Sequence, residues 1–517
     1  MRSFILFFRK LINRQLQRFW LNLIVAILIL IGLAIRLYGL TDPPLDYHPT
    51  RQLMNAIVAR GMYYQMLPSA DPQVREAAIH LMNAVEQDEP RFQNFIVAIT
   101  YLVIGGEYVW VARIYSVLFW IAGGIVLFLL ARRMVSTRAA AVSLGYFLLL
   151  PFATLASRSF QVDPLMVMFI IFTAYAFYRW GEEQTWKRAL LAGLLAGLTI
   201  LVKVTAAFPL IGMAVAVVLS QVGFRKALKS LKIWAMVLLA ALPGIIYYFI
   251  GISGRSSTYF SFWTISLSSK LLDPSYYVRW LSFLHGIVDL TIFFLALGGM
   301  LIAPPKARAL LFGMWAGYFV YGLFFPFQIS THDYYHLMLM PIISMSLAPL
   351  AELILDRLGK QGFFWRGITA AALLFCVIYP AWVGRSVIFV SGNNYRHEPP
   401  IWAEIGQVLP RDGDVIALTH DYGYRLAYYG WRMPNALWPT GADFDLSAAR
   451  GLSQEDFQTM FEDRTAGKRY FLVTLGGELE KQTSLKDMLY NNYTIFAEGD
   501  GYVIFDLMTP PNPETAP

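Results

Sequence analysis

The sequence predicts an all-α polytopic membrane protein with about eleven transmembrane helices, followed by a small extracytoplasmic α/β domain. Of its 517 residues, 57% are hydrophobic and only 15% are charged, whereas soluble proteins carry roughly 25% charged residues. Apolar runs of about 18 residues or more recur along most of the chain, and each is long enough to cross a bilayer as a helix. Basic residues gather in short clusters between these runs. A soluble globular protein is therefore excluded.

Eleven apolar segments are expected to span the membrane. The first is too long for the apolar core of a signal peptide and contains Arg36 near its end, so we interpret it as an uncleaved span. The segments are residues 20–40, 110–131, 139–156, 164–180, 188–202, 205–222, 232–252, 282–303, 309–326, 336–355 and 367–387.

The basic residues predict the orientation, because cytoplasmic loops carry an excess of Lys and Arg. The segment before the first span is basic, which places the N-terminus in the cytoplasm, and every second loop after it is basic as well. An odd number of spans then puts the C-terminal domain outside. We expect a multi-pass protein of the plasma (inner) membrane. The predicted cytoplasmic loops contain Arg132, Arg133, Arg138, Arg179, Lys187, Arg188, Arg225, Lys226, Lys229, Lys232, Lys306, Arg308, Arg357, Lys360 and Arg366.

Composition divides the chain into three parts. Residues 1–390 form the predicted transmembrane domain, which includes a long outer loop at 41–109 with amphipathic helices. Residues 391–508 form the extracytoplasmic α/β domain, and the proline-rich tail 509–517 is expected to be disordered. Within the α/β domain, β-rich runs at 415–418, 470–473, 493–496 and 502–505 alternate with helical stretches at 402–409 and 453–461.

Charge and cysteine content exclude two further classes. The net charge is +8, but membrane topology accounts for the basic clusters, so nucleic acid is not expected as a partner. The single cysteine, Cys376, lies in an apolar run. A disulfide framework or a cysteine-based metal site within the chain is therefore excluded.

The long outer loop begins with a dense polar motif. Two prolines before Asp46 stiffen the chain and are expected to hold Asp46 and His48 near the bilayer surface. Asp42 is interpreted as a turn residue or helix cap. Asp46 has the same alternative, but the density of Asp, His and Arg up to Arg51 favours a functional role for the motif.

Two other outward turns carry isolated charges. Arg158 and Asp163 lie in the second, where Asp163 followed by Pro164 is also a good helix start, so capping and function both remain open. Lys203 is the only charge between residues 190 and 223. An ionisable residue at such a depth is by default a functional candidate, and snorkelling to the interface is the alternative.

The last two outward loops add further candidates. Arg255 lies in the fourth, among aromatic residues that any membrane interface attracts. The fifth contains His332, Asp333, Tyr335 and His336. The two histidines are spaced i, i+4 but lack supporting carboxylates, so no metal ligands are predicted. The sequence leaves open whether a divalent cation is bound but does not indicate one, and no cofactor is required.

All of the candidate site residues in the outward loops fall on the outer side of the predicted topology. A channel or transporter would place its charges near the bilayer midplane and often shows repeated halves. An outer cavity lined by carboxylates, basic groups and tyrosines instead fits an enzyme that acts on a phosphate-bearing lipid, where basic groups hold the phosphate and a carboxylate serves as base.

Several segments resemble those of C-type integral-membrane glycosyltransferases, the superfamily of protein O-mannosyltransferases and lipid A aminoarabinose transferases (glycosyltransferase family 39/83-like). Family members carry an acidic pair in the first loop; here His48-Pro49 takes its place, with Asp46 two residues earlier. The order and common sidedness of the segments carry the resemblance. They are Thr50-Arg51 followed by Ala56-Ile57-Val58-Ala59-Arg60, Gln161-Val162-Asp163-Pro164-Leu165, Leu198-Thr199-Ile200-Leu201-Val202-Lys203 and His332-Asp333-Tyr334-Tyr335-His336-Leu337.

The resemblance implies a GT-C-like fold and transfer of a sugar, with inversion, from a polyprenyl-phosphate donor to an extracytoplasmic lipid, glycan or protein. It implies Asp46 as the base and Asp163 as a second catalytic carboxylate. The other candidates would bind phosphate or sugar: His48, Arg51, Arg158, Lys203, Arg255, His332, Asp333, Tyr335 and His336. The alternatives are a flippase for polyprenyl-linked glycans and a noncatalytic scaffold.

Overall fold

A computed structural model describes residues 2–86, 88–365, 367–368, 371–372, 375, 394–410, 414–453 and 455–510. The chain forms two compact units. The membrane unit comprises Met1–Leu40, Asp88–Phe92 and Arg113–Val390, and the composite unit comprises Thr41–Gln87, Gln93–Ala112 and Ser391–Pro517.

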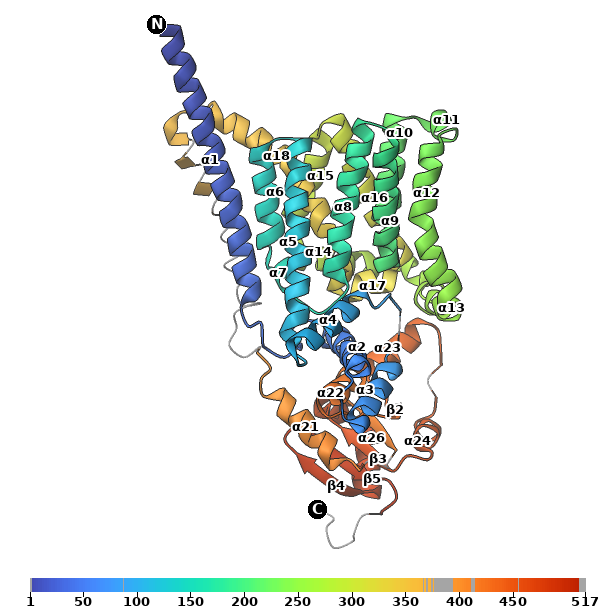
Figure 1. Ribbon diagram of the computed structural model, residues 1–517. Helices are drawn as coiled ribbons and strands as arrows, with labels where there is room; N and C mark the ends of the chain where they lie inside the picture. Colours follow the sequence, from blue (N-terminus) through green and yellow to red (C-terminus); the bar gives the residue numbers. More distant parts are fainter. Residues whose placement is uncertain are drawn as a thin grey trace. The chain divides into compact units, whose positions relative to one another are not determined.

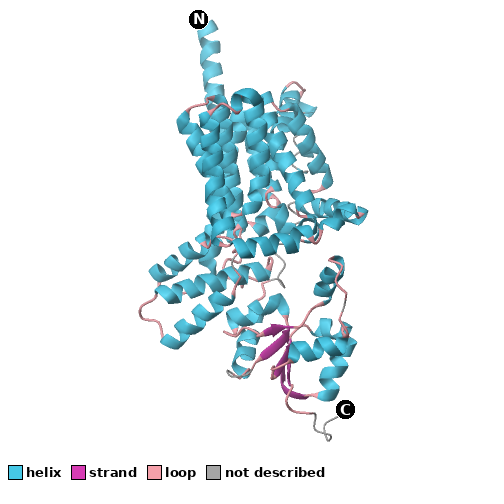
Figure 2. Ribbon diagram, turned by 90° about the vertical axis from the view of Figure 1, so that its right-hand side faces the viewer, coloured by secondary structure: helices cyan, strands magenta, loops and turns pink. Residues whose placement is uncertain are grey.

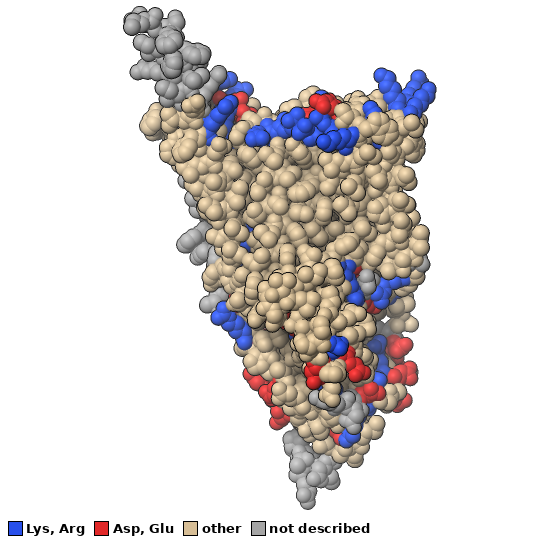
Figure 3. Space-filling view, in the orientation of Figure 1, with Lys and Arg blue, Asp and Glu red and all other residues tan. Residues whose placement is uncertain are grey.

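The helices of the membrane unit follow the apolar segments of the sequence (Figure 1). Basic side chains gather at one end of these helices, and the surface between the ends is nearly free of charge (Figure 3). The helices are α1 (Arg2–Leu37), α5 (Val109–Met134), α6 (Thr137–Leu149), α7 (Pro151–Ala156), α8 (Asp163–Glu182), α9 (Trp186–Val202), α10 (Ala207–Gln221), α11 (Phe224–Ala227), α12 (Leu231–Gly244), α13 (Ser253–Phe260), α14 (Pro274–Val288), α15 (Leu290–Ile302), α16 (Pro305–Phe324), α17 (Pro326–Thr331) and α18 (Leu339–Gly359).

Membrane-spanning helices are present, but the expected count of eleven is not reached in the described part of the chain. Seven helices there are long and apolar enough to cross a membrane, or eight if α14 and α15, bent by 89°, form one span. The expected span 139–156 is broken before Pro151, because a residue that precedes proline is driven out of the helical conformation. Helix α9 has only 17 residues. The expected span 367–387 lies largely outside the described residues.

The bend between α14 and α15 has a local cause at Asp289. This residue has a φ of 64°, in the left-handed region, and it ends α14. Its carboxylate then accepts a hydrogen bond of 2.7 Å from the backbone amide of Thr291 and caps α15. One aspartate therefore both stops one helix and starts the next.

Glycines bring α10 and α16 into backbone contact within the membrane unit. A Cβ atom added at Gly212 would lie 2.1 Å from the carbonyl oxygen of Gly313, and one added at Gly317 would lie 2.3 Å from that of Phe208. Small residues at helix interfaces permit this close approach in membranes, where van der Waals packing drives helix association.

The composite unit contains a five-stranded sheet with the strand order β2-β1-β3-β5-β4 (Figure 2). Strands β1, β2 and β3 are parallel, whereas β5 is antiparallel to β3 and β4. The four expected β-rich runs are present as strands, and the short β2 is not predicted by the sequence pattern. The strands are β1 (Val415–Leu418), β2 (Ala436–Leu437), β3 (Tyr470–Val473), β4 (Thr494–Gly499) and β5 (Tyr502–Asp506).

Short helices surround this sheet, and the two faces bury separate apolar clusters. One cluster is built around Trp438, Phe461 and Phe471, and the other around Trp402 and Ile405. The expected helical stretches 402–409 and 453–461 correspond to α21 and α24. The helices are α21 (Glu398–Val408), α22 (Tyr424–Tyr429), α23 (Gly441–Ala449), α24 (Phe457–Thr465), α25 (Gly476–Lys481) and α26 (Thr483–Asn492).

The long loop and the C-terminal domain, which begins at Ser391, lie in one compact unit. The loop contains α2 (Pro49–Met66) and α3 (Pro72–Ala84), at the two stretches expected to be helical, and α4 (Phe92–Ile104), which the sequence pattern does not predict. Polar contacts across more than 350 residues join it to the C-terminal domain; for example, Arg396 donates to Asp42 over 2.7 Å. Of the expected disordered tail 509–517, residues 511–517 lie outside the described residues.

Candidate active site

Lys203 and Asp163 form a buried ion pair in the membrane unit. The Nζ atom of Lys203 lies 2.8 Å from Oδ1 of Asp163, and the two residues are 5% and 4% exposed. Asp163 lies in the first turn of α8, and Lys203 directly follows the end of α9. The lysine therefore does not snorkel to solvent, and the carboxylate of Asp163 bonds to an ammonium group rather than capping its helix.

Aromatic rings surround the ammonium group of Lys203. Its Nζ atom lies 5.5 Å from the ring centroids of both Tyr334 and Tyr335, within the range of cation–π attraction. The hydroxyl of Tyr335 lies 3.4 Å from that of Tyr259 on α13. Three of the predicted site residues, Asp163, Lys203 and Tyr335, are thus brought together in one unit.

The structure places His336 in the interior of the membrane unit, and its role in binding sugar or phosphate stays a prediction. It is fully buried, and its Nε2 atom lies 2.9 Å from the carbonyl oxygen of Ile329, so Nε2 carries the proton and donates. Nδ1 then accepts from the hydroxyl of Tyr318 over 2.6 Å, and that oxygen accepts from Trp280 over 3.1 Å. Both ring nitrogens are occupied by the protein itself.

His332 lies at the edge of the aromatic cluster. Its Nδ1 atom is 2.8 Å from the hydroxyl of Thr331, and its ring makes edge contacts with Tyr334 and Tyr335. Asp333 follows it and is half-buried. The described residues contain no group of three or more His, Cys, Asp or Glu side chains placed to hold a metal ion, and the engaged nitrogens of His336 exclude a shared site with His332 in this conformation.

Arg158 belongs to a group of buried arginines at the end of the first helix. It donates to the carbonyl oxygen of Gly39 over 3.0 Å, and Arg113 donates to the same oxygen over 2.9 Å. Arg36 donates to Ser157 over 2.7 Å. All three arginines are at most 3% exposed. The sequence predicts Arg158 as a site residue but not its arginine neighbours, although Arg36 is a visible charge at the end of an apolar run.

Arg255, the remaining predicted residue of the membrane unit, is exposed on α13. Its role in phosphate binding stays a prediction.

In the composite unit, Asp46 is held by the first turn of α2. Gln52 is fully buried, and its Nε2 atom donates to Oδ1 of Asp46 over 3.1 Å and to the carbonyl oxygen of Tyr47 over 2.7 Å. His48 precedes the helix with a φ of 44°, a left-handed conformation that is costly for a residue other than glycine. The segment before α2 therefore adopts a defined, strained shape around Asp46.

His48 and Arg51 lie on either side of this helix start. The ring of His48 packs edge-on against Tyr47, with 4.6 Å between the ring centroids. Arg51 is half-buried in the first turn of α2. Both residues are close in sequence to Asp46, as expected, and their binding roles stay predictions.

A buried ion pair that the sequence does not predict stabilises the composite unit. Arg60 on α2 donates two hydrogen bonds of 2.9 Å to the carboxylate of Glu107. Its guanidinium lies 4.0 Å from the ring centroid of Tyr428 and 4.4 Å from that of Trp431. Glu107 is the only acidic residue between Glu89 and Asp163, and this isolation is the signal from which its role could have been suspected.

Electrostatics keep Arg60 charged. Burial alone would lower the pKa of Arg60, but the charge and hydrogen bonds of Glu107, together with Tyr428 and Tyr64, outweigh it and hold the pKa above its usual value. Burial, together with the same carboxylate, raises the pKa of Tyr428 well above its usual value. The hydroxyl of Tyr428 therefore stays protonated and donates to Glu107 over 2.7 Å.

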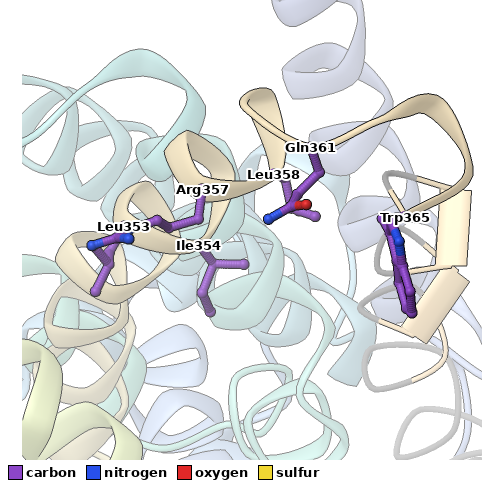
Figure 4. Close-up of a pocket in the computed structure, with 6 residues that line it drawn as sticks. All are labelled: Leu353, Ile354, Arg357, Leu358, Gln361 and Trp365. Carbon is purple, nitrogen blue, oxygen red and sulfur yellow. The ribbon is translucent and has the colours of Figure 1, made fainter.

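A pocket of about 560 Å³ lies at the end of α18 (Figure 4). None of the predicted site residues lines it. Its lining residues are Leu353, Ile354, Arg357, Leu358, Gln361 and Trp365.

Comparisons with known proteins connect this architecture to a family. The family model for dolichyl-phosphate-mannose-protein mannosyltransferase matches residues 88–248. A comparison with curated proteins gives no match.

Solved structures of membrane glycosyltransferases have a similar fold. ArnT from Cupriavidus metallidurans in the apo state has a TM-score of 0.56 at 16% identity, covering 95% of this chain and 98% of its own. The same protein bound to undecaprenyl phosphate has a TM-score of 0.54 at 16% identity, covering 93% and 97%. The archaeal oligosaccharyltransferase AglB from Archaeoglobus fulgidus, in complex with an inhibitory peptide and a dolichol-phosphate, has a TM-score of 0.53 at 13% identity, covering 97% and 75%.

At these identities the likeness to the solved structures shows a shared fold. The family model matches the part of the chain from α4 to α12. The family match over residues 88–248 and the shared fold agree with the resemblance to C-type integral-membrane glycosyltransferases that the sequence motifs carry.

Proposed function

We propose that the protein transfers a hexose or pentose from a polyprenyl-phosphate donor to an extracytoplasmic lipid, glycan or protein acceptor, with inversion at the anomeric carbon. The observation that carries this proposal is the carboxylate of Asp46, held by Gln52 in a strained segment at the start of α2. The neighbours solved with undecaprenyl phosphate and with a dolichol-phosphate support the class of donor.

In the proposed reaction, Asp46 removes the proton from an acceptor hydroxyl, and the acceptor oxygen attacks the anomeric carbon of the sugar. The bond between that carbon and the phosphate oxygen breaks, and polyprenyl phosphate leaves with the electron pair. One displacement inverts the configuration, and the proton passes from Asp46 to solvent. A positioned carboxylate is a suitable base because it can accept the proton of the reacting hydroxyl in the transition state. The reaction needs no redox cofactor.

The departing phosphate needs positive charge nearby. Lys203 and Arg158 are the proposed buried partners, with Arg255 as an exposed one. Asp163 keeps Lys203 charged in an apolar environment, because an opposite charge favours the ionised form. This is the role we propose for Asp163 in catalysis. His332, Asp333 and Tyr335 are proposed to contact the sugar or phosphate, whereas His336 supports their loop through its buried hydrogen bonds.

We also propose that the N-terminus lies in the cytoplasm and the composite unit outside, since the basic loops gather at one end of the membrane helices.

The proposed function is tested with the full chain in proteoliposomes and a panel of labelled polyprenyl-phosphate hexoses and pentoses. We expect sugar to pass to an acceptor in a membrane extract, with stoichiometric appearance of polyprenyl phosphate. Repeating the assay with EDTA measures any need for a divalent cation. Movement of intact lipid-linked sugar across the bilayer without cleavage would instead show a flippase and contradict the proposal.

A further inference from the structure

The chain adopts an unusual conformation directly after β1. Asp421 and Tyr422 have φ values of 51° and 55°, and Gly423 follows with 82°. Left-handed residues other than glycine are energetically costly, and two in succession persist only where the surrounding contacts enforce them. The surroundings of this turn therefore show what it holds in place.

The turn lies where an α/β sheet commonly presents a functional site. Strand β1 is flanked by β2 on one side and β3 on the other, so the chain reverses its direction of travel across the sheet at β1. Ligands of open α/β sheets bind outside the carboxyl ends of the strands at such a point. Here the hydroxyls of Thr419, after β1, and Thr474, after β3, lie 2.9 Å apart.

Asp421 uses both carboxylate oxygens. Oδ2 accepts from Nε of Arg425, and Arg425 also lies 2.9 Å from Glu398 on α21. Oδ1 accepts from the hydroxyl of Thr50 over 2.8 Å. An ion-paired network within the C-terminal domain thus fixes one side of Asp421 and leaves the other side bonded to the long loop.

Thr50 connects this turn to the segment that carries Asp46. It lies in the first turn of α2, two residues before Gln52, which holds Asp46. It also lies two residues after His48, the strained residue at the start of the helix. One hydrogen bond between Thr50 and Asp421 therefore joins two strained segments of the composite unit.

We propose that Asp421 is a positioning residue that acts through Thr50 to fix the start of α2, and with it the carboxylate of Asp46. This inference rests on the proposed role of Asp46 as base. Open α/β sheets usually bind a ligand at the carboxyl ends of their strands. In this C-terminal domain, the turn at the carboxyl end of β1 instead holds the start of α2 in position.

The test removes the hydroxyl of Thr50 while keeping the shape of its side chain. In the full chain, we expect Thr50→Val to lower kcat for sugar transfer about 10- to 100-fold, since misplacing a reacting group by about 1 Å costs on that order. The KM for the polyprenyl-phosphate donor should change less than about twofold. Thr50→Ser restores the hydroxyl and should recover kcat to within about twofold, which a general loss of packing would not permit.

A second variant keeps the proposal testable if Thr50→Val fails to fold. Asp421→Asn weakens the acceptor, and Asn tolerates the left-handed conformation, so the turn is preserved. We expect a similar fall in kcat, and a combined loss smaller than the product of the two single losses, because both substitutions act on the same hydrogen bond. The matched control is Arg396→Gln, which breaks the contact with Asp42 between the same two segments and should leave kcat unchanged.

The outcomes separate this inference from the proposed function. If Asp46→Asn abolishes transfer while Thr50→Val and Asp421→Asn keep parental kcat, the positioning role is wrong and the base assignment stands. If Arg396→Gln lowers kcat as much as Thr50→Val, the contact has only a general structural effect and the inference is wrong. Parental transfer by Asp46→Asn would overturn both.

Discussion

Lys203 and Asp163 form an ion pair of 2.8 Å that joins the end of α9 to the start of α8 in the interior of the membrane unit. Each side chain alone would be a buried, uncompensated charge. Removing one partner of a buried pair is strongly destabilising, because the other charge remains without a counterion.

We therefore expect Lys203→Met alone to destabilise the protein by roughly 3–5 kcal/mol. The double variant Lys203→Met/Asp163→Asn should recover most of this loss, because no net charge remains buried. Thermal unfolding in detergent measures both effects. Lys229→Met, at an exposed lysine, is the control and should behave as the parent.

The double variant also tests the proposed contact with the donor phosphate. It should fold but bind a polyprenyl-phosphate sugar more weakly than the parent, because the ammonium group is lost. Parental binding by the folded double variant would show that the pair has only a structural role.

Removing one partner of the Arg60–Glu107 pair should likewise destabilise the composite unit. Arg60→Gln should lower stability by roughly 3–5 kcal/mol, since Glu107 would keep only one of its three hydrogen bonds, the one from Tyr428. Arg60→Lys should also be destabilising, because a lysine cannot form the two-pronged contact or stack between the rings of Tyr428 and Trp431. Hydrogen exchange in α2 measures the effect. Equal protection in the parent and both variants would show that the pair contributes no stability.

An exposed ion pair provides the comparison. Lys486 lies 2.8 Å from Glu480 on the surface of the same unit. Lys486→Met should leave hydrogen exchange in the unit unchanged, since exposed pairs contribute little.

Protonation of His420 should make the stability of the sheet depend on pH. Burial, reinforced by the charge of Arg425, lowers the pKa of His420 below its usual 6.5. Between the folded and unfolded pKa values the unfolded chain binds more protons, so stability is present above pH 6.5 and is lost as the pH falls below it.

We expect hydrogen exchange of β1 and β3, corrected for its intrinsic pH dependence, to show less protection at pH 5.5 than at pH 7. His420→Asn should remove this difference, whereas His397→Asn, at an exposed histidine of the same unit, should retain it. An unchanged difference in His420→Asn would assign the pH dependence to other groups.

The predicted orientation is tested by thiol labelling in intact cells, in a background where Cys376 is replaced by Ser. A cysteine at the exposed Ser453 should react with an impermeant reagent added outside, and one at the exposed Lys229 should not. Labelling only of the cysteine at position 229 would show that the orientation is the reverse of the predicted one.

Much of the fold could be predicted because it depends on local pattern. Apolar runs give the positions of the helices, and short β-rich runs give four of the five strands. The break before Pro151 and the sharp bend at Asp289 are harder to predict, because they divide segments that remain apolar throughout.

The site could be predicted only in part, because its contacts are distant in sequence. Lys203 is conspicuous as a lone charge, but its partner Asp163 lies 40 residues earlier. The bond between Thr50 and Asp421 spans 371 residues, and no pattern in either segment indicates it. Neither the residue type of His336 nor its spacing from His332 shows whether it binds a substrate. Only the structure shows that Tyr318 and Ile329 occupy its ring nitrogens.

The proposed reaction depends most on Asp46 as the base. Asp46→Asn keeps the shape of the side chain and an oxygen that can accept from Gln52, but it removes the proton acceptor. Loss of general-base catalysis is worth about 10²–10⁴-fold in rate. Asp42→Asn is the matched control, since Asp42 lies in the same loop and bonds to Arg396.

The most direct test measures sugar transfer from labelled polyprenyl-phosphate donor in reconstituted membranes for these two variants and the parent. We predict that Asp46→Asn abolishes transfer while donor binding stays close to parental, and that Asp42→Asn loses far less. Near-parental transfer by Asp46→Asn, or a larger loss in Asp42→Asn, would contradict the assignment of Asp46 as the base and direct the search for the base to Asp163 and Asp333.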